Sequence, residues 1–214
     1  MLGVAILIIV MSVMNGFKTD LTKKILGLNP HIVIQPNSFI IDDNYISKLK
    51  NKFQGMSLNK SFSGEGIIIS NDNAKGIILK GINKDKQTSI DFLNQNITSG
   101  DIQNFKKNHV FIGTELAYNL NLKKGDNISL MSSAFVATPL GSLPKQENYK
   151  IAGTFNTGFI EFDRNIVLLN INDILSIFDK EENDLNIEIY LKNPLDANFY
   201  KKKIEKINPN FFIY

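Results

Sequence analysis

The chain has 214 residues, 43% hydrophobic and 21% charged, which is typical of a folded globular protein with one large domain or two small ones. Its 24 Lys and Arg against 21 Asp and Glu give a formal net charge of +3, which is too small for a broad phosphate-binding surface and argues against a nucleic-acid partner. The lack of cysteine excludes disulfides, thiol nucleophiles and cysteine metal sites, and only 2 histidines remain for imidazole chemistry.

The first 17 residues carry no charged side chain, and residues 1–14 form an apolar run. A helix needs about 20 such residues to span a bilayer core, so this run alone is too short. It also lacks the basic start and the small-residue cleavage site of a secretory signal. Two interpretations remain, of which we favour the first: the end of a transmembrane helix whose first half precedes Met1, or a short helix buried in a core.

This helix is predicted to continue beyond the apolar run. From Phe17 to Leu28 apolar residues recur every three or four positions, opposite a lysine-rich face. Pro30 then predicts its end, because proline cannot continue a helix. We therefore expect residues 1–28 to form the end of a membrane helix and a stalk.

Two similar strand–helix–strand units are predicted near the two ends of the remaining chain. The first has a strand at 31–35, a helix at 42–53 capped by Asp42 or Asp43, and strands at 56–62, 66–70 and 75–80. The second has a strand at 186–191, a helix beginning at Asn193-Pro194, and a strand at 211–214. We expect residues 29–82 and 185–214 to pair into one split α+β layer, with residues 83–184 as an inserted lobe.

The inserted lobe has its own strand and helix signals. A helix at 114–120 and a turn at Gly125-Asp126 precede a strand at 127–131; strands at 149–155 and 165–170 follow, and Asn172 or Asp173 can cap a helix at 174–178. Residues 135–148 contain two prolines and a glycine, which leads us to expect an irregular loop without a continuous β-ladder.

Four segments together resemble the lipoprotein-releasing permeases of the LolC/LolE family, within the MacB-like superfamily of ABC transporters. They are VAILIIVMSVMNGFKTDLTKKILGLNPHIVI from residue 4, FIGTELAYNLNLKKGDNISL from 111, FVATPLGSLPKQENYKIAGTF from 135 and GFIEFDRNIVLLNINDILSIF from 158. The most specific elements are Met14-Asn15-Gly16-Phe17, the Gly125-Asp126 turn and the Thr138-Pro139-Leu140-Gly141 to Pro144 stretch. Their order and spacing over nearly the whole chain carry the resemblance.

The resemblance implies a multi-pass inner-membrane protein, of which this chain holds the end of the first transmembrane helix and a periplasmic domain. That domain would have a MacB-like α+β fold with a discontinuous porter subdomain and an inserted sabre subdomain. The protein would be a permease rather than an enzyme, without a cofactor on this chain. The implied partners are a second permease subunit in a homo- or heterodimer, a cytoplasmic ATPase subunit, a LolA-like periplasmic carrier, the lipoprotein substrate and membrane lipid.

The resemblance also implies that residues 135–148 form a hook that docks the carrier. The expected contact residues are Val136, Thr138, Pro139, Leu140, Gly141, Leu143 and Pro144. Apolar side chains between rigid prolines lose little entropy on binding, which suits a docking segment. The alternative is a long connection whose apolar residues pack back onto the lobe.

Other candidate residues are few. Ser12 and Asn15 are polar residues on the apolar helix, and we expect them to face the second permease or the lipoprotein, unless Asn15 merely lies at the membrane surface. Paired carboxylates at element boundaries are typical of helix caps, and neither histidine has a second ligand at helical spacing. We therefore expect no catalytic residue and no metal site.

Two other functions are compatible with these patterns. A MacB- or FtsX-like permease acting in efflux or cell division would share the fold and the lever, but would lack the carrier-docking loop. A soluble periplasmic binding domain would need an enclosed polar pocket, for which the sequence offers few clustered ionisable groups.

Overall fold

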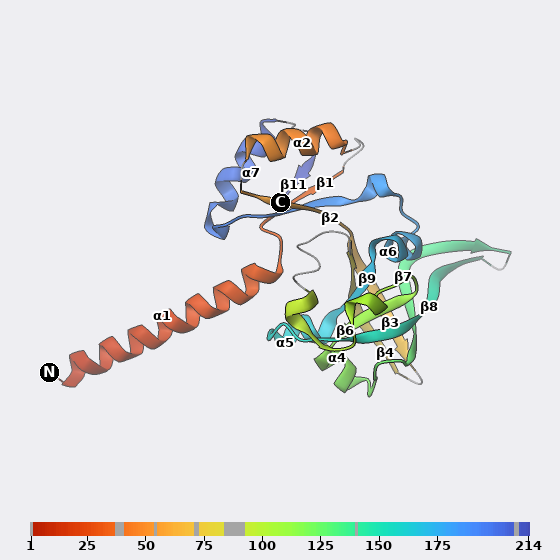
Figure 1. Cartoon of the computed structure of the whole chain (residues 1–214), viewed down its shortest axis with the longest axis horizontal. Helices are drawn as coiled ribbons and strands as arrows, with labels where there is room; N and C mark the ends of the chain where they lie inside the picture. The colour runs from red at the N-terminus through yellow and green to blue at the C-terminus, as the bar shows by residue number, and fades with distance from the viewer. Residues whose placement is uncertain are drawn as a thin grey trace.

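The computed structural model describes residues 2–36, 41–53, 55–70, 73–83, 93–139, 141–207 and 210–214, and leaves out the side chains of residues 2, 19–28, 43 and 138. Within these residues the chain forms a long N-terminal helix, a four-stranded sheet and a seven-stranded sheet (Figure 1). The expected α+β class is confirmed.

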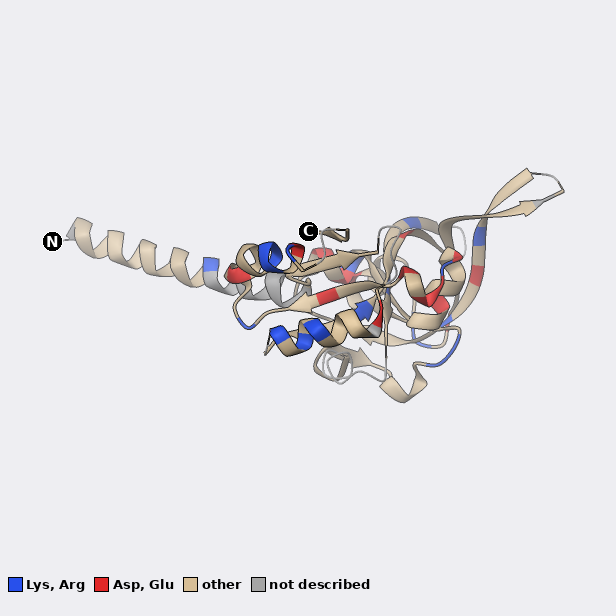
Figure 2. Ribbon diagram, turned by 90° about the horizontal axis from the view of Figure 1, so that it is seen from above, with Lys and Arg blue, Asp and Glu red and all other residues tan. Residues whose placement is uncertain are grey.

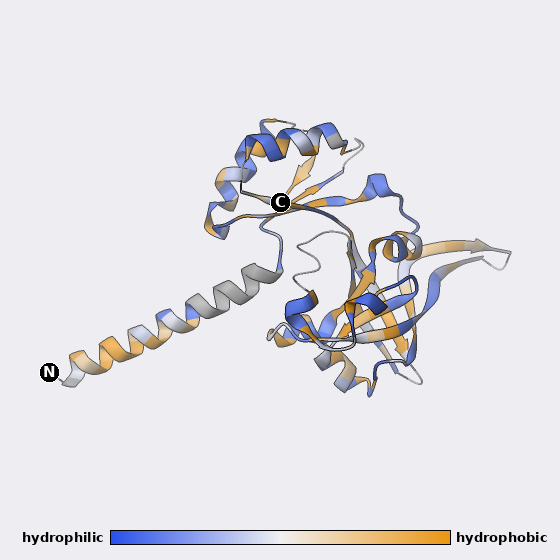
Figure 3. Cartoon of the chain, in the orientation of Figure 1, coloured by the Kyte–Doolittle hydropathy of each residue, from blue (hydrophilic) through white to orange (hydrophobic). Residues whose placement is uncertain are grey.

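Helix α1 (Leu2–Leu28) projects away from both sheets (Figure 1). It ends before Pro30, as predicted, and the large apolar side chains between Val4 and Phe17 are exposed. Figure 3 shows this first part of α1 as predominantly hydrophobic. Among the described residues, no helix combines the length and the apolar character needed to cross a membrane.

The four-stranded sheet joins the two ends of the chain. Its order is β11-β1-β10-β2, formed by Phe212–Ile213, Ile32–Gln35, Asn186–Tyr190 and Ser57–Ser61, and all three pairings are antiparallel. Helices α2 (Asp43–Lys52) and α7 (Ala197–Glu205, preceded by the 3₁₀ turn η3, Pro194–Asp196) cover one face. The predicted pairing between the N-terminal and C-terminal segments is therefore confirmed.

The core of this layer lies between the sheet and the two helices. Ile32, Ile34 and Ile189 point from the strands towards Leu49 of α2 and Ile204 of α7, and each is at most 1% exposed. The predicted cap of α2 is also present, because the Asp42 carboxylate accepts a hydrogen bond from the Tyr45 amide at 2.8 Å.

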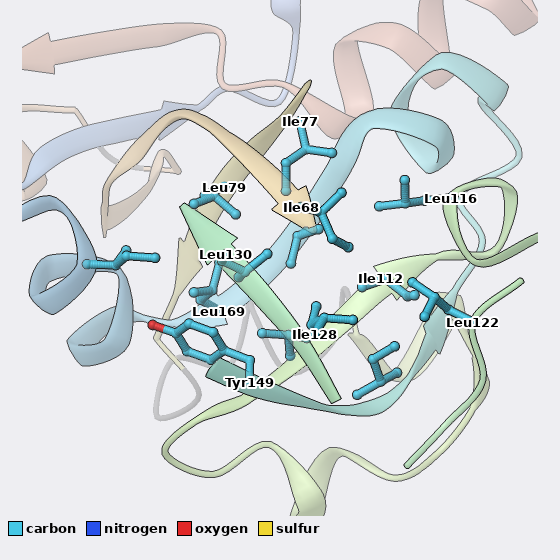
Figure 4. Packing of buried hydrophobic residues seen from close by; sticks show 14 of the residues in the cluster. Ile68, Ile77, Leu79, Ile112, Leu116, Leu122, Ile128, Leu130, Tyr149 and Leu169 are labelled. Carbon is cyan, nitrogen blue, oxygen red and sulfur yellow. The ribbon is translucent and has the colours of Figure 1, made fainter. Parts of the chain in front are cut away.

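The seven-stranded sheet has the order β5-β8-β6-β9-β4-β3-β7. Its strands are β3 (Ser63–Ser70), β4 (Asn73–Ile82), β5 (Ile97–Ser99), β6 (His109–Gly113), β7 (Asn127–Thr138), β8 (Gly141–Phe155) and β9 (Ile166–Asn170). The helical elements beside it are η1 (Ile102–Asn104), α4 (Thr114–Asn119), α5 (Ile160–Asn165), α6 (Ile171–Phe178) and η2 (Glu182–Asp184). Because β7 also pairs with β8, the sheet closes around an apolar interior. Figure 4 shows side chains from several of these strands, including Ile68, Leu130, Tyr149 and Leu169, converging there.

The division between the two sheets differs from the boundary expected after Ile82. Strands β3 and β4 pair with β7 and β9, so they belong to the same sheet as the middle of the chain. The chain therefore crosses between the sheets at Phe62 rather than after β4. The prediction failed here because lateral pairing depends on contacts distant in sequence, which strand periodicity does not reveal.

The start of α6 also differs from its prediction. The helix begins at Ile171, and its N-cap is Asn170, whose side-chain oxygen accepts a hydrogen bond from the Asn172 amide at 3.1 Å. Asp173, expected as a possible cap, lies inside the helix instead. It is buried and accepts a hydrogen bond from the Asn108 amide at 2.9 Å.

Candidate docking site

Strands β7 and β8 extend beyond the seven-stranded sheet as a two-stranded arm, which is the most prominent projection of the sheet in Figure 1. We define the docking arm as residues 133–147. Its outer part pairs Phe135 with Pro144, Val136 with Leu143 and Thr138 with Gly141. The expectation of an irregular loop without a ladder was wrong.

Two features explain why a ladder forms despite the prolines. Strand β8 pairs with β6 only from Lys150 onwards, so Pro144 lies where β8 has a free outer edge and proline is tolerated there. Pro139 lies between the strands, beyond Thr138. The register also shifts between Met131 and Phe135, and such a bulge bends a strand, which directs the arm away from the sheet.

The outer arm presents apolar side chains to solvent. Phe135, Val136 and Leu143 are 64%, 46% and 57% exposed, so these three do not pack back onto the lobe. Pro139, Gly141 and Pro144 are exposed too. Leu140 lies outside the described residues, as does the side chain of Thr138. The arm thus gathers five of the seven expected contact residues on one exposed element.

No charged residue occurs between Asn127 and Pro144, and Figure 2 shows the outer arm without blue or red segments. Charge appears only at its base, where Lys145 and Glu147 follow Pro144. Figure 3 shows the β7 side of the arm as hydrophobic and the β8 side near the base as hydrophilic. An uncharged apolar tip on a polar base can bind an apolar surface without desolvating an ion.

Helix α6 braces the base of the arm through polar contacts. The Lys145 ammonium donates to the Ser176 carbonyl at 2.6 Å, and the Ser176 hydroxyl donates to Glu147 at 3.1 Å. On the other strand, the buried Ser132 hydroxyl donates to the Ile177 carbonyl at 2.5 Å. These bonds fix both strands of the arm to the last turns of one helix.

Tyr149 supports this brace from inside the closed sheet. Its hydroxyl donates to Glu147 at 2.8 Å. Burial raises the pKa of Tyr149, and the hydrogen bond to Glu147 raises the pKa further. Tyr149 therefore remains a neutral donor that holds the Glu147 carboxylate at the base of the arm.

The other expected site residues lie elsewhere. Ser12 and Asn15 are exposed on α1. In Figure 1, α1 and the arm project from opposite sides of the molecule. The His31 ring accepts a hydrogen bond from the Leu191 amide at 2.8 Å. His109 Nδ1 lies 2.9 Å from the Lys107 carbonyl. Within the described part of the chain, no three His, Asp or Glu side chains are grouped so as to hold a metal ion.

Comparison with known proteins supports the sequence resemblance, although no protein-family model matches the chain. The chain is 24% identical to the lipoprotein-releasing system transmembrane protein LolC of Xylella fastidiosa, over 82% of this chain and 43% of the relative. It is 28% identical to LolC of Buchnera aphidicola over 99% of this chain and 53% of the relative. It is also 28% identical to LolE of Haemophilus influenzae over 62% of this chain.

A solved structure has the same fold. The periplasmic region of MacB from Actinobacillus actinomycetemcomitans aligns with a TM-score of 0.50 and 11% identity over 86% of each chain. The chain is thus similar in sequence to LolC and LolE, and in fold to the periplasmic region of MacB. It spans about half the length of the LolC proteins it matches, 43% and 53% of the two above.

The sequence patterns did not reveal the residues that hold the arm in place. Ser132, Lys145, Glu147 and Ser176 come from three elements that only the fold brings together. One weak signal was available, since Lys145 and Glu147 are two positions apart and would share one face of a strand. The prolines on either side of Gly141, which predict an irregular stretch, mask this alternation.

Proposed function

We propose that this chain belongs to a permease subunit in an ABC transporter that releases outer-membrane-directed lipoproteins from the inner membrane. Its α1 is the end of a transmembrane helix inserted in that membrane, and the remainder is a periplasmic domain. The docking arm binds a periplasmic carrier of the LolA type, which receives the lipoprotein. The names of the relatives support the lipoprotein-releasing role. The exposed, charge-free arm is the observation that carries the docking role.

The remaining partners follow from this role. A second permease subunit, identical or different, completes the transporter in the inner membrane, and ATP hydrolysis takes place on a separate cytoplasmic subunit. Ser12 and Asn15 lie three positions apart on α1 and therefore on one face of the helix, which contacts the second permease or the lipoprotein. Replacing both with Leu should reduce lipoprotein release; full release would contradict this contact.

The contacts of α6 suit a relay of movement from α1 to the arm. Helix α1 leads into β1 of the four-stranded sheet. The chain then crosses to the other sheet at Phe62, whose ring lies 5.2 Å from that of Phe178 at the end of α6. The same turn of α6 holds the base of the arm through Ser176 and Ile177. A tilt of α1 would therefore reach the arm through packed and hydrogen-bonded elements.

Carrier binding tests the docking role directly. A purified LolA-type carrier from the same genome would be titrated against the full chain and against Val136→Asp and Leu143→Asp variants. Each variant places an unpaired charge on the apolar tip, and we expect at least about a tenfold loss of affinity. Ile160→Asp is the matched control, because Ile160 is 56% exposed on α5, outside the arm.

Unchanged carrier affinity in both arm variants, with native circular dichroism, would refute the docking role. It would favour the efflux or cell-division alternative, which the shared MacB fold permits. An equal loss in the Ile160→Asp control would show that the effect is not specific to the arm, and would count against the proposal as well.

A further inference from the structure

Helix α7 and the 3₁₀ turn η3 before it carry an apolar stripe on their outer face that the core does not use. Ala197, Tyr200 and Ile204 face the core of the four-stranded sheet. Leu195 in η3 and Phe199 in the first turn of α7 are 81% and 57% exposed. The Phe199 ring touches that of Tyr200, with centroids 5.4 Å apart, but the core of the four-stranded sheet buries neither of these two apolar side chains.

Lysines surround this stripe. Lys203 lies one turn beyond Phe199, with its Nζ 4.1 Å from the centre of the Phe199 ring, and Lys202 beside it is exposed. The last turn of α2 adds the exposed Lys50 and Lys52. That turn lies against α7, because the ring of Phe53, the C-cap of α2, is 5.8 Å from the ring of Tyr200.

Lys192, also exposed, lies close to Gly55 just after α2. We call the surface formed by Lys50, Lys52, Lys192, Leu195, Phe199, Lys202 and Lys203 the basic edge. The nearby acidic groups are partly compensated within α7 and its preceding turn. Asp196 accepts a hydrogen bond from Asn193 at 3.2 Å, and Glu205 lies 4.0 Å from Lys201.

The basic edge lies on the side of the molecule from which α1 projects. Figures 1 and 2, which are related by a quarter turn, both show α7 and the C-terminal end of α2 on this side, and Figure 2 shows blue basic segments on both helices there. A surface of lysines around exposed Phe and Leu is typical of protein segments that lie in a membrane interface: the apolar side chains enter the headgroup region while the lysines stay with the phosphates.

We propose that the basic edge binds anionic phospholipid headgroups of the membrane into which α1 inserts, and that this contact sets the tilt of the four-stranded sheet. The argument for a lipid rather than a protein occupant is the combination of charge complementarity with the position beside α1. The proposal rests on the proposed membrane insertion of α1.

Because the chain lacks cysteine, a fluorescent probe can be attached at any single introduced cysteine. The full chain would carry the probe at Leu195→Cys in the basic edge, at Val13→Cys in α1, or at Tyr118→Cys on α4, where Tyr118 is 85% exposed. Each labelled protein would be mixed with vesicles of phosphatidylcholine alone or with added phosphatidylglycerol. Access of aqueous iodide to the probe would then be measured.

We expect the Leu195→Cys probe to be shielded only by vesicles with phosphatidylglycerol, and the Tyr118→Cys probe to stay accessible. The double variant Lys202→Glu with Lys203→Glu should need at least about tenfold more lipid for half-maximal shielding. The reason is that each lysine near an anionic surface contributes about fivefold to membrane affinity. The control pair is Lys123→Glu with Lys124→Glu, two adjacent exposed lysines before β7.

The probes at Leu195→Cys and Val13→Cys distinguish lipid binding by the basic edge from membrane insertion of α1. A shielded Val13→Cys probe with an accessible Leu195→Cys probe would overturn the basic edge and leave the membrane anchor intact. A shielded Leu195→Cys probe with an accessible Val13→Cys probe would support lipid binding and contradict the anchor. If neither probe is shielded, both proposals fall. Equal shielding by neutral vesicles, or equal loss in the control pair, would overturn the role of the lysines.

Discussion

Lys80 of β4 and Glu188 of β10 join the two sheets, with Nζ and Oε1 3.1 Å apart and side chains only 17% and 9% exposed. Tyr190 donates its hydroxyl to the other oxygen of the Glu188 carboxylate at 2.8 Å. Burial raises the pKa of Tyr190, and the negative charge of Glu188 raises the pKa further. The contact between the sheets is thus a buried ion pair supported by a neutral hydroxyl donor.

Lys80→Ala should lower the free energy of unfolding by about 3 kcal/mol, because it leaves the Glu188 carboxylate buried without its cation. Urea denaturation of the full chain would measure this loss. The double variant Lys80→Ala with Glu188→Ala should lose clearly less than the sum of the two single losses. Strictly additive losses would show that the pair does not couple the sheets.

Tyr45 makes stability depend on alkaline pH. Its ring packs against Phe211 with centroids 4.9 Å apart, and burial raises the pKa of Tyr45 to about 12. An unfolded tyrosine ionises near pH 10, so the native state holds the proton more tightly. The contribution of this residue to the free energy of unfolding is therefore present below about pH 10 and falls as the pH rises towards 12.

Tyr45→Phe removes the ionisable group. The difference in free energy of unfolding, variant minus unmodified chain, should therefore be about 1 kcal/mol larger at about pH 11 than at neutral pH. Near neutral pH the substitution should cost little, because no described atom hydrogen-bonds the buried Tyr45 hydroxyl. Urea denaturation at both pH values gives the difference. A constant stability difference between the two proteins would contradict the raised pKa.

The brace between α6 and the arm should control the mobility of the arm. Ser132→Ala and Lys145→Met each remove a bond to the last turns of α6, worth about 1 kcal/mol. Amide exchange in residues 133–147 should accelerate about fivefold, and carrier affinity should fall. Lys150→Met, an exposed substitution on β8 outside the brace, is the control. Unchanged exchange in the arm would refute the brace.

Gly113 lies where a side chain cannot fit. A Cβ atom there would fall 1.8 Å from the carbonyl oxygen of Asp163. That backbone is held in place because the buried Asp163 carboxylate accepts hydrogen bonds from the amide and the hydroxyl of Thr157, at 2.9 Å and 2.8 Å. We expect Gly113→Ala to lower the free energy of unfolding by at least about 3 kcal/mol.

Gly76 provides the contrast for this prediction. It also lies in a strand, but a Cβ atom there would meet nothing within 4 Å. Gly76→Ala should raise the free energy of unfolding by about 0.5 kcal/mol, because alanine reduces the freedom of the unfolded chain. Thermal unfolding of the two variants side by side would test both. A stable Gly113→Ala protein would show that the Asp163 backbone can move.

Sequence patterns predicted the local elements of the four-stranded layer well. The Asp42 cap, the helix that follows it and the proline after Asn193 are signals carried by neighbouring residues, and each appears in the structure. The docking arm was predicted as an exposed apolar segment but with the wrong backbone. Its prolines indicated a loop, and only the free edge of β8 explains why they are tolerated in a ladder.

The order of residues by itself determined where helices and strands form and that the opening segment is apolar, because periodicity and capping act over a few positions. Only the tertiary structure decided that β3 and β4 join the second sheet, that α6 holds the arm, and that Lys80 meets Glu188. These contacts join residues tens of positions apart. The packing of whole layers determines which of these contacts form, and a short stretch of sequence carries no information about that packing.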